Sequence, residues 1–295
     1  MSAPIVVIGD VLIDEMREGR SAMSVPGGSA LNVAVGLAAL GTPSVLVGMI
    51  GDDDDGRVIR EYLGSWGVTL LPTLGPHGTG RAISDRRGGE PSYRFNRASI
   101  ERGIQIDDAL VALVSGAGLI AISGFPFDNT AQVDALLRLL AGSTASVAID
   151  PNPRQGMLSD PDAFRAGLER AAASAALLKL SDEDAELLYG EPIDAVVDRY
   201  LPLVSMAVLA TRGEHGASLH TRSSSTSRPI VADDRPIVDT MGAGDATFAV
   251  TLQALSMAGP SDPVDWPTVL ETAMLTAAET IRHPGAVLRR DPGDG

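Results

Sequence analysis

Short apolar runs alternate along the chain with longer segments in which apolar residues recur at helical spacing. Residues 4–10 (PIVVIGD) and 44–51 (SVLVGMIG) have the pattern of buried strands. One helical face is predicted between them, ended by Gly41 and made of Ala30, Val33, Ala34, Leu37 and Ala38. Four later runs have the same strand pattern: residues 118–124, 146–151, 176–182 and 206–211.

Continuous apolar strands separated by helices predict an α/β fold with a mostly parallel sheet covered on both faces. Ligands of such sheets bind at the carboxyl ends of the strands. Small or polar residues stand directly after the predicted strands: Asp10, Gly51, Gly124, Asp150, Ser181, Thr211 and Asp239. We therefore expect the functional site at that edge.

Residues 78–99 break the alternation, because two short strand-like pieces flank the turn sequence RRGGEP. A hairpin charged on both faces does not suit a buried sheet, so we predict a small β lid built from 14–26 and 78–99. A disordered surface loop is the alternative. The predicted core comprises residues 1–13, 27–77 and 100–290, with a C-terminal tail at 291–295.

Composition narrows the functional classes. The net charge of −15, with Lys179 as the single lysine, argues against a nucleic-acid partner. The absence of cysteine excludes disulfides, thiolate nucleophiles and Cys-ligated zinc. No apolar run approaches the ~20 residues of a spanning helix, and the first residues lack a basic leader. We expect a cytoplasmic protein that does not enter a membrane.

The stretch Ile237–Pro260 (IVDTMGAGDATFAVTLQALSMAGP) carries the clearest chemistry. Gly242, Ala243 and Gly244 form a predicted turn between a strand end and a helix that Asp245 opens. Backbone N–H groups at such a helix start form a cradle for an anion. Asp245 beside that cradle suits a base that deprotonates a hydroxyl attacking a phosphoryl group. The alternative is an aspartate that only caps the helix.

Several motifs in order resemble the ribokinase-like (PfkB) carbohydrate kinases. DTMGAGD (239–245) matches the family's C-terminal signature, and GGSALNVAVGLAALG (27–41) is similar to its N-terminal signature. VGMIGDDDDG resembles the family's G-x-D-x-x-G. Three more segments look similar in order and spacing: LKLSDEDAELLYG, LATRGEHGA and RHPGA. The resemblance runs from Ile5 to about Val287 and implies a three-layer α/β/α sandwich.

The resemblance implies roles for individual residues. Asp245 would be the catalytic base, and the amides of Gly242, Ala243 and Gly244 the anion hole. The implied sugar-binding residues are Asp14, Gly28, Asn32, Arg97 and Arg154, with Arg97 in the lid. The implied nucleotide-binding residues are Lys179, Ser181, Thr211, Gly213 and Gly216.

The metal assignments rest on the same resemblance. The family's N-x-x-E motif is replaced here by Ser181 and Asp184, and Asp184 would act on Mg²⁺ that accompanies ATP. Asp239 and Thr240 resemble contributors to a monovalent-cation loop, which implies K⁺. The acidic run Asp52–Asp55 is explained more simply as carboxylates at a helix start.

We therefore expect an ATP-dependent sugar kinase. The segments GDVLID, DPNPR and KLSDEDAELLYG resemble fructokinase-like members, which favours fructose; 2-keto-3-deoxygluconate comes second, then ribose and nucleosides. A dinucleotide-dependent dehydrogenase would need G-x-G-x-x-G after the first strand, and a Walker-type kinase G-x-x-x-x-G-K-[ST]; neither motif occurs. An inactive sugar or nucleotide sensor on the same fold stays open. A homodimer through the lid strands is also expected.

Overall fold

The computed structural model describes residues 3–18, 21–85, 92–232, 234–258, 263–283, 285–286 and 288. Its main sheet has the strand order β13-β12-β11-β10-β9-β8-β1-β4-β5. The strands are β1 (Ile5–Gly9), β4 (Ser44–Ile50), β5 (Thr69–Leu74), β8 (Leu119–Ser123), β9 (Ser146–Asp150), β10 (Leu177–Ser181), β11 (Ala207–Thr211), β12 (Ala217–His220) and β13 (Ser225–Arg228). The neighbouring strands β11, β10, β9, β8, β1, β4 and β5 pair in parallel, whereas β12 pairs antiparallel with both β11 and β13.

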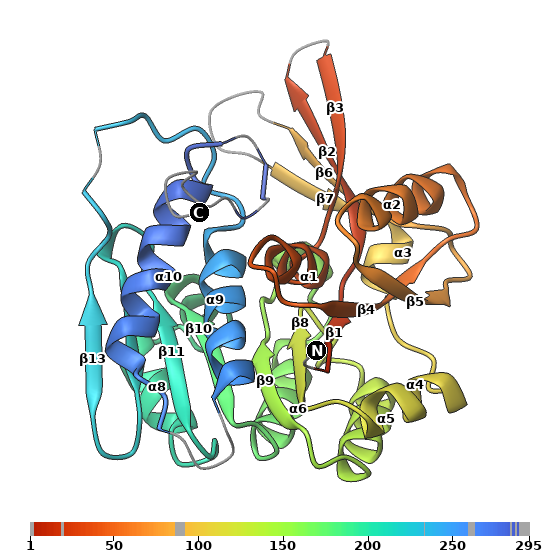
Figure 1. The fold of residues 1–295 in the computed structure, drawn as a ribbon. Helices are drawn as coiled ribbons and strands as arrows, with labels where there is room; N and C mark the ends of the chain where they lie inside the picture. Colours follow the sequence, from red (N-terminus) through yellow and green to blue (C-terminus); the bar gives the residue numbers. More distant parts are fainter. Residues whose placement is uncertain are drawn as a thin grey trace.

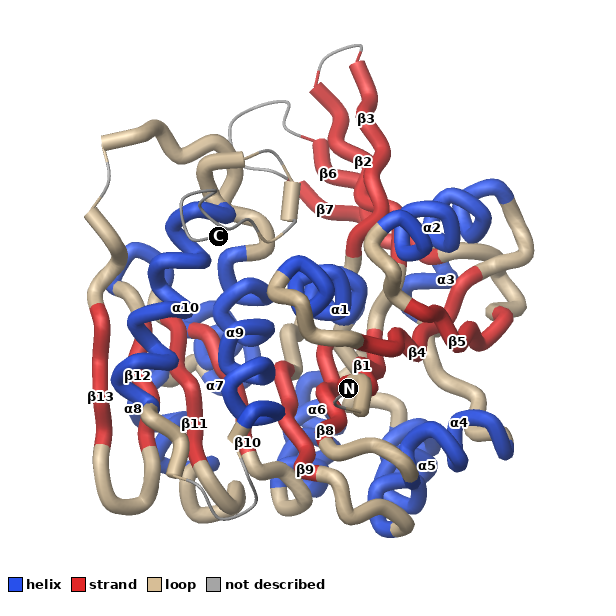
Figure 2. The backbone as a smooth tube through the Cα atoms, viewed as in Figure 1, coloured by secondary structure: helices blue, strands red, loops and turns tan. Residues whose placement is uncertain are grey.

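Helices cover both faces of this sheet, as Figures 1 and 2 show. On one face lie α1 (Ser29–Ala39), α9 (Ala243–Met257) and α10 (Trp266–Thr280). The other face carries α4 (Asp108–Ser115), α5 (Thr130–Ala141), α6 (Pro161–Ala172), α7 (Asp182–Tyr189) and α8 (Ile193–Tyr200). The predicted α/β fold with a mostly parallel sheet is confirmed.

Two apolar cores result from the alternation of side chains along each strand. In β1, Ile5 and Val7 pack into the core under α1 and α9, whereas Val6 and Ile8 pack into the core on the other face. Phe248 of α9 is fully buried in the first core. Because every residue of β1 is needed by one core or the other, its sequence is continuously apolar.

A second sheet, order β3-β2-β6-β7, stands apart from the first (Figure 1). It consists of β2 (Leu12–Glu18), β3 (Ser21–Gly27), β6 (Gly80–Asp85) and β7 (Ser92–Phe95). The predicted hairpin is confirmed, because β6 and β7 pair antiparallel. Its turn RRGGEP and the tail 291–295 lie outside the described residues. We call these four strands the lid sheet; closure over a sugar and pairing with a second copy stay predictions.

Short helices complete the described part of the chain. Helix α2 (Asp54–Ser65) follows β4 and packs near the lid sheet, α3 (Arg97–Ile100) follows β7, and two 3-10 turns are η1 (Gln155–Met157) and η2 (Gly213–His215). Arg97, placed in the lid by its sequence position, thus begins a helix beyond the last lid strand. Within the described residues no helix has the length and apolar character needed to cross a membrane.

Candidate active site

Asp245 lies in the first turn of α9 and reaches across to α1. Its Oδ1 accepts a hydrogen bond from Ser29 Oγ at 2.6 Å, and its Oδ2 accepts one from Asn32 Nδ2 at 2.9 Å. Ser29 Oγ also lies 2.6 Å from Ser123 Oγ at the end of β8. The residue that precedes α9 as its N-cap is Gly242, without a side-chain cap. Asp245 is therefore not a capping residue, and its carboxylate joins α9 to α1.

The turn before α9 requires glycine at its first position. Gly242 has a φ of 81°, and a Cβ there would lie 2.4 Å from the backbone oxygen of Ala286. The first N–H groups of an α-helix have no partner inside the helix, and they carry the positive end of its dipole. Residues 241–245 are partly exposed. The start of α9 can thus accept an anion directly beside the carboxylate of Asp245.

Two further carboxylates belong to the same cluster. Burial raises the pKa of Asp10 to about 6, opposed by Arg102 and by a hydrogen bond from the Ala30 amide at 3.0 Å. Burial also raises the pKa of Asp14 to about 7, helped by the negative charge of Asp10 and opposed by Arg154. At neutral pH, Asp14 is therefore balanced between its protonated and ionised forms.

Arg154 supplies positive charge to this cluster. Solvent reaches its side chain, yet enough protein surrounds the guanidinium that desolvation opposes its charge. The nearby carboxylates of Asp184 and Asp245 outweigh that effect and raise the pKa of Arg154. A guanidinium within electrostatic reach of Asp184 and Asp245 can neutralise phosphate oxygens.

The structure brings together most of the sugar-binding residues expected from sequence. Gly28, with φ 102°, precedes α1, and a Cβ there would lie 2.6 Å from Asp10 O. Asn32 contacts Asp245, as described above. Arg97 is different: its side chain is 68% exposed and its Nε donates to Glu101 at 2.8 Å. Its sugar-binding role stays a prediction.

Sequence reasoning missed four members of the cluster. They are Asp10, Ser29, Arg102 and Ser123, all buried. Only Asp10 carried a signal, as a carboxylate directly after an apolar strand. Serines and an arginine on separate elements leave no recognisable spacing.

A carboxylate beside first-turn amides that have no partner inside their helix, with a second carboxylate and an arginine nearby, can activate a hydroxyl and hold a phosphoryl group. The model of the pfkB family carbohydrate kinases matches residues 2–291. The chain belongs to this family. It is an ATP-dependent sugar kinase, a sugar phosphotransferase.

Individual relatives agree with the family assignment. A fructokinase of Klebsiella pneumoniae is 33% identical over 281 residues, covering 89% of this chain and 87% of the relative. One of Salmonella typhimurium is 32% identical over 298 residues, covering 95% and 92%. Among solved structures, Vibrio cholerae fructokinase with fructose, ADP and calcium superposes with a TM-score of 0.80 at 24% identity, over 97% and 94% of the two chains. At this level of identity, the structural similarity to the Vibrio cholerae protein supports the fold alone.

The nucleotide-binding residues expected in this kinase follow the neighbouring strands β10 and β11. Thr211 ends β11, and Ser181 ends β10 and caps α7. Gly213 and Gly216 have φ values of 48° and 84° around η2. Parallel pairing of β10 with β11 places these residues at one edge of the sheet.

Lys179 is buried in the protein rather than exposed at the edge of the sheet. Its Nζ is 2.8 Å from Asp150 Oδ2, and both side chains are buried. A Cβ on Gly244 would lie 3.3 Å from that Nζ, so the lysine sits against the α9 turn. Burial opposes its charge, but Asp150 and Asp184 raise the pKa of Lys179 overall.

The candidate metal residues make local hydrogen bonds. Asp184 Oδ2 accepts from Ser181 N at 2.8 Å, and Ser181 Oγ accepts from Asp184 N at 3.0 Å, which closes a capping box. Asp239 accepts from the amides of Met241 and Gly285 at 3.1 and 3.3 Å, while Thr240 is exposed. Among the described residues, no group of three His, Cys, Asp or Glu side chains is arranged to hold a metal ion.

Proposed function

We propose that this kinase transfers the γ-phosphoryl group of ATP to a hydroxyl of fructose, with Asp245 as the catalytic base. The observation that carries the proposal is the position of Asp245, held by Ser29 and Asn32 beside the open first turn of α9. The fructokinase relatives favour fructose as the acceptor. 2-Keto-3-deoxygluconate, ribose and nucleosides are the other acceptors to be tested.

In the proposed reaction, Asp245 accepts the proton of the attacking hydroxyl. The hydroxyl oxygen forms a bond to the γ-phosphorus, and the bond from that phosphorus to the leaving oxygen of ADP breaks. The N–H groups of Gly242, Ala243 and Gly244 stabilise the charge on the transferred group. Positioning and charge neutralisation supply most of the acceleration in phosphoryl transfer.

The sugar would lie between the lid sheet and α1. Asp14 on β2 would accept hydrogen bonds from its hydroxyls, Gly28 would allow close backbone approach, and Arg154 would contact the sugar or the transferred phosphate. Thr211, Gly213 and Gly216 would line the nucleotide site, with Ser181 at its edge. Lys179, whose Nζ lies against Gly244 in the α9 turn, would contribute to nucleotide binding.

The residues present fit Mg²⁺ that arrives with ATP, because this ion needs one or two carboxylates besides phosphate oxygens and water. Asp184 would hold it, directly or through water, since only one of its oxygens is needed for the capping box. Bound Mg²⁺ would supply counter-charge to the phosphates. Asp239 and Thr240 would order a loop for a monovalent cation such as K⁺.

A coupled ADP-release assay over fructose, 2-keto-3-deoxygluconate, ribose and adenosine tests the proposal, with Asp245→Asn as the variant. We expect fructose to be turned over best, and kcat of the variant to fall by about 10²–10⁴ with both KM values kept within a few-fold. Asp108→Asn is the matched control, because Asp108 is an exposed aspartate in the first turn of α4. Full turnover by Asp245→Asn would disprove the assignment of the base.

A further inference from the structure

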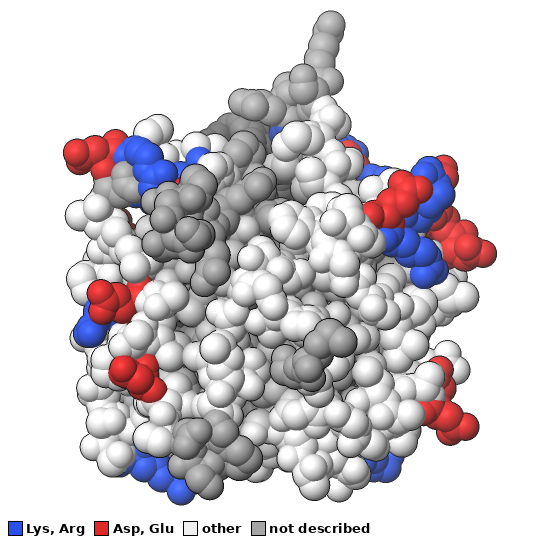
Figure 3. All heavy atoms as spheres, in the orientation of Figure 1, with Lys and Arg blue, Asp and Glu red and all other residues white. Residues whose placement is uncertain are grey.

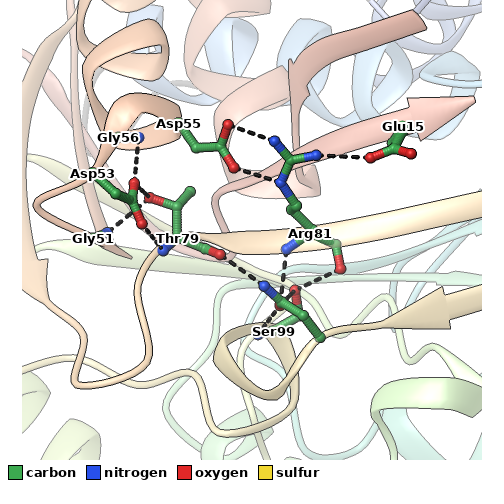
Figure 4. Close-up of polar contacts among 9 residues, drawn as sticks. Glu15, Gly51, Asp53, Asp55, Gly56, Thr79, Arg81 and Ser99 are labelled. Carbon is green, nitrogen blue, oxygen red and sulfur yellow. Dashed lines mark hydrogen bonds and ion pairs between the residues drawn. The ribbon is translucent and has the colours of Figure 1, made fainter. Parts of the chain in front are cut away.

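The Gly51-x-Asp53-x-x-Gly56 motif lies outside the site described above and binds the base of the lid sheet. Asp53 is the N-cap of α2, and its Oδ1 accepts from Gly56 N at 2.9 Å. The same carboxylate accepts from Thr79 N at 2.8 Å and from Thr79 Oγ1 at 2.5 Å (Figure 4). Gly51 N donates to Thr79 Oγ1 at 2.9 Å. Thr79, directly before β6, is thus fixed to the start of α2.

Both glycines of the motif are required by this contact. A Cβ on Gly51 would lie 2.4 Å from Asp53 Oδ2, and one on Gly56 would lie 2.2 Å from Gly51 O. The motif therefore encodes a close junction between the core and the first residue before a lid strand.

Two residues beyond Thr79, Arg81 joins three elements through one guanidinium. Its Nε and one terminal nitrogen donate to the two oxygens of Asp55 on α2 at 2.5 and 2.7 Å. The other terminal nitrogen donates to Glu15 on β2 at 2.7 Å (Figure 4). The side chains of Glu15, Asp55 and Arg81 are 12%, 23% and 33% exposed, so water competes only partly for these bonds. We call Glu15, Asp55 and Arg81 the hinge triad.

Glu15 directly follows Asp14 on β2. Successive side chains of a strand point to opposite faces, so β2 presents Glu15 to α2 and Asp14 to the other side. There Asp14 packs on Gly27, whose Cβ would lie 2.0 Å from Asp14 Oδ2, and feels the charges of Asp10, Arg154 and Asp245. The hinge triad therefore binds one face of β2, and Asp14 projects from the opposite face of the same strand.

We propose that Arg81 is a positioning residue for the sugar site: by fastening β2 to α2 it sets where Asp14 stands relative to Asp245. This inference rests on the proposed function, in which one sugar contacts both aspartates. Because Asp14 belongs to the lid sheet and Asp245 to the core, loosening the junction displaces the acceptor hydroxyl from its base. The nucleotide residues at β10 and β11 do not touch the triad.

Kinetics of Arg81→Gln, Asp55→Asn and the double variant test the proposal. Each single variant is expected to lower kcat/KM for sugar about tenfold, through a higher KM for sugar and a lower kcat, since small misplacements of reacting groups are costly. The KM for ATP should stay within about twofold, because that site lies on other elements. The double variant should match the singles, at about tenfold rather than a hundredfold, because both changes break one unit. Arg81→Lys loses the bidentate guanidinium but keeps the positive charge, so its effect should lie between those of wild type and Arg81→Gln.

Arg57→Gln is the matched control. Arg57 lies on the same helix, but its two ion pairs, to Asp54 and Glu61, stay within α2 and are exposed. It should leave both KM values unchanged. Multiplicative effects of the two single changes, or an equal rise in both KM values, would overturn the proposal.

Amide hydrogen exchange gives a readout that does not need turnover. Arg81→Gln should exchange about tenfold faster than wild type in β2 and β6, with β8 and β9 unchanged; Arg57→Gln should not differ. If wild type phosphorylates no sugar, yet Arg81→Gln exchanges faster than wild type in β2 and β6, the proposed function fails while the structural role of the hinge triad is supported. If sugars are phosphorylated but exchange and KM for sugar are unaffected by Arg81→Gln, the positioning role is wrong.

Discussion

Asp10, Asp14 and Asp245 place three carboxylates within electrostatic reach of one another, offset by Arg102 and Arg154. Burial, helped by the neighbouring negative charges, favours the protonated forms of Asp10 and Asp14. Because the pKa of Asp14 lies near neutrality, its charge changes over the pH range in which kinases are usually assayed.

The pH dependence of sugar use should follow Asp14. Burial raises the pKa of Asp14 to about 7, and only the ionised form offers both oxygens as charged acceptors to the sugar hydroxyls. The ratio kcat/KM for sugar should therefore fall about tenfold per pH unit below this pKa and level off above it. Initial rates from pH 5.5 to 8.5 measure this. Asp10→Asn removes a negative charge that raises the pKa of Asp14, so it should move the acid limb to lower pH; a limb that moves to higher pH contradicts the assignment.

Lys179 and Asp150 form a buried ion pair, and breaking this pair should lower the free energy of unfolding. In Lys179→Met, Asp150 is left without its cation, which costs about 3–5 kcal/mol at pH 8. Burial already raises the pKa of Asp150, and without the lysine it rises further. A raised carboxyl pKa in the folded state means that stability falls as pH rises, so the loss should be smaller at pH 5. Urea unfolding at both pH values measures it, and Lys179→Met/Asp150→Leu should recover most of the loss.

At the residue scale, sequence could supply candidates but not their partners. Asp245 and Asn32 were found through motifs, yet the bonds that unite them with Ser29 join positions more than 200 residues apart. Lys179 was assigned to the nucleotide, and only the structure shows its buried contact with Asp150. Such pairings depend on which strands become neighbours, and local spacing does not encode that.

At the element scale, the turn before α9 shows how backbone shape serves a site. Gly41 and Gly242 both have left-handed φ, 76° and 81°, but a Cβ on Gly41 meets nothing within 4 Å. Gly41→Ala should therefore lose about 1–2 kcal/mol from backbone strain alone and keep its kcat. Gly242→Ala should lose about 1–3 kcal/mol more through the contact with Ala286 and at least about tenfold in kcat, because the amides proposed to bind the phosphoryl group move. Thermal unfolding and steady-state rates separate the two; equal behaviour of both variants would refute the role of the turn.

The strands were the most predictable elements. Six apolar runs became strands of the main sheet because burial on both faces leaves a strong pattern. The strand predicted to end before Asp239 is wrong, because residues 234–240 form no strand and are largely exposed. Strand β5 was not anticipated: Thr69–Leu74 is only partly buried and includes Pro72 at the sheet edge. Arg97 begins a helix rather than continuing the lid because Asn96 caps α3 by accepting from Ser99 N.

At the scale of the whole molecule, the chain carries a net charge of −15. On the face shown in Figure 3, acidic and basic side chains lie intermixed near the margins, and the middle is largely uncharged. Long-range repulsion of anionic ATP should nevertheless act at low salt. The neutral sugar should not feel it.

The KM for ATP should consequently fall about twofold as choline chloride raises the ionic strength from about 0.02 to about 0.15 M, because salt screens exposed charges beyond roughly 10 Å. The KM for fructose is the internal control and should not change. Measurements use saturating Mg²⁺ and a fixed K⁺ concentration. A rise in the KM for ATP would mean that local positive charge outweighs the net charge of the protein.

Before any sugar arrives, both oxygens of Asp245 already hold hydrogen bonds from α1. A stray water molecule entering beside the nucleotide must therefore compete with Ser29 and Asn32 for this carboxylate. We therefore expect slow ATP hydrolysis by the resting enzyme, whereas a sugar held by several contacts can bring its hydroxyl to a remaining lone pair of Asp245 while Ser29 and Asn32 keep the carboxylate in place. The rate of ATP hydrolysis in the absence of sugar should thus be low, and it should increase when Ser29 is replaced by alanine.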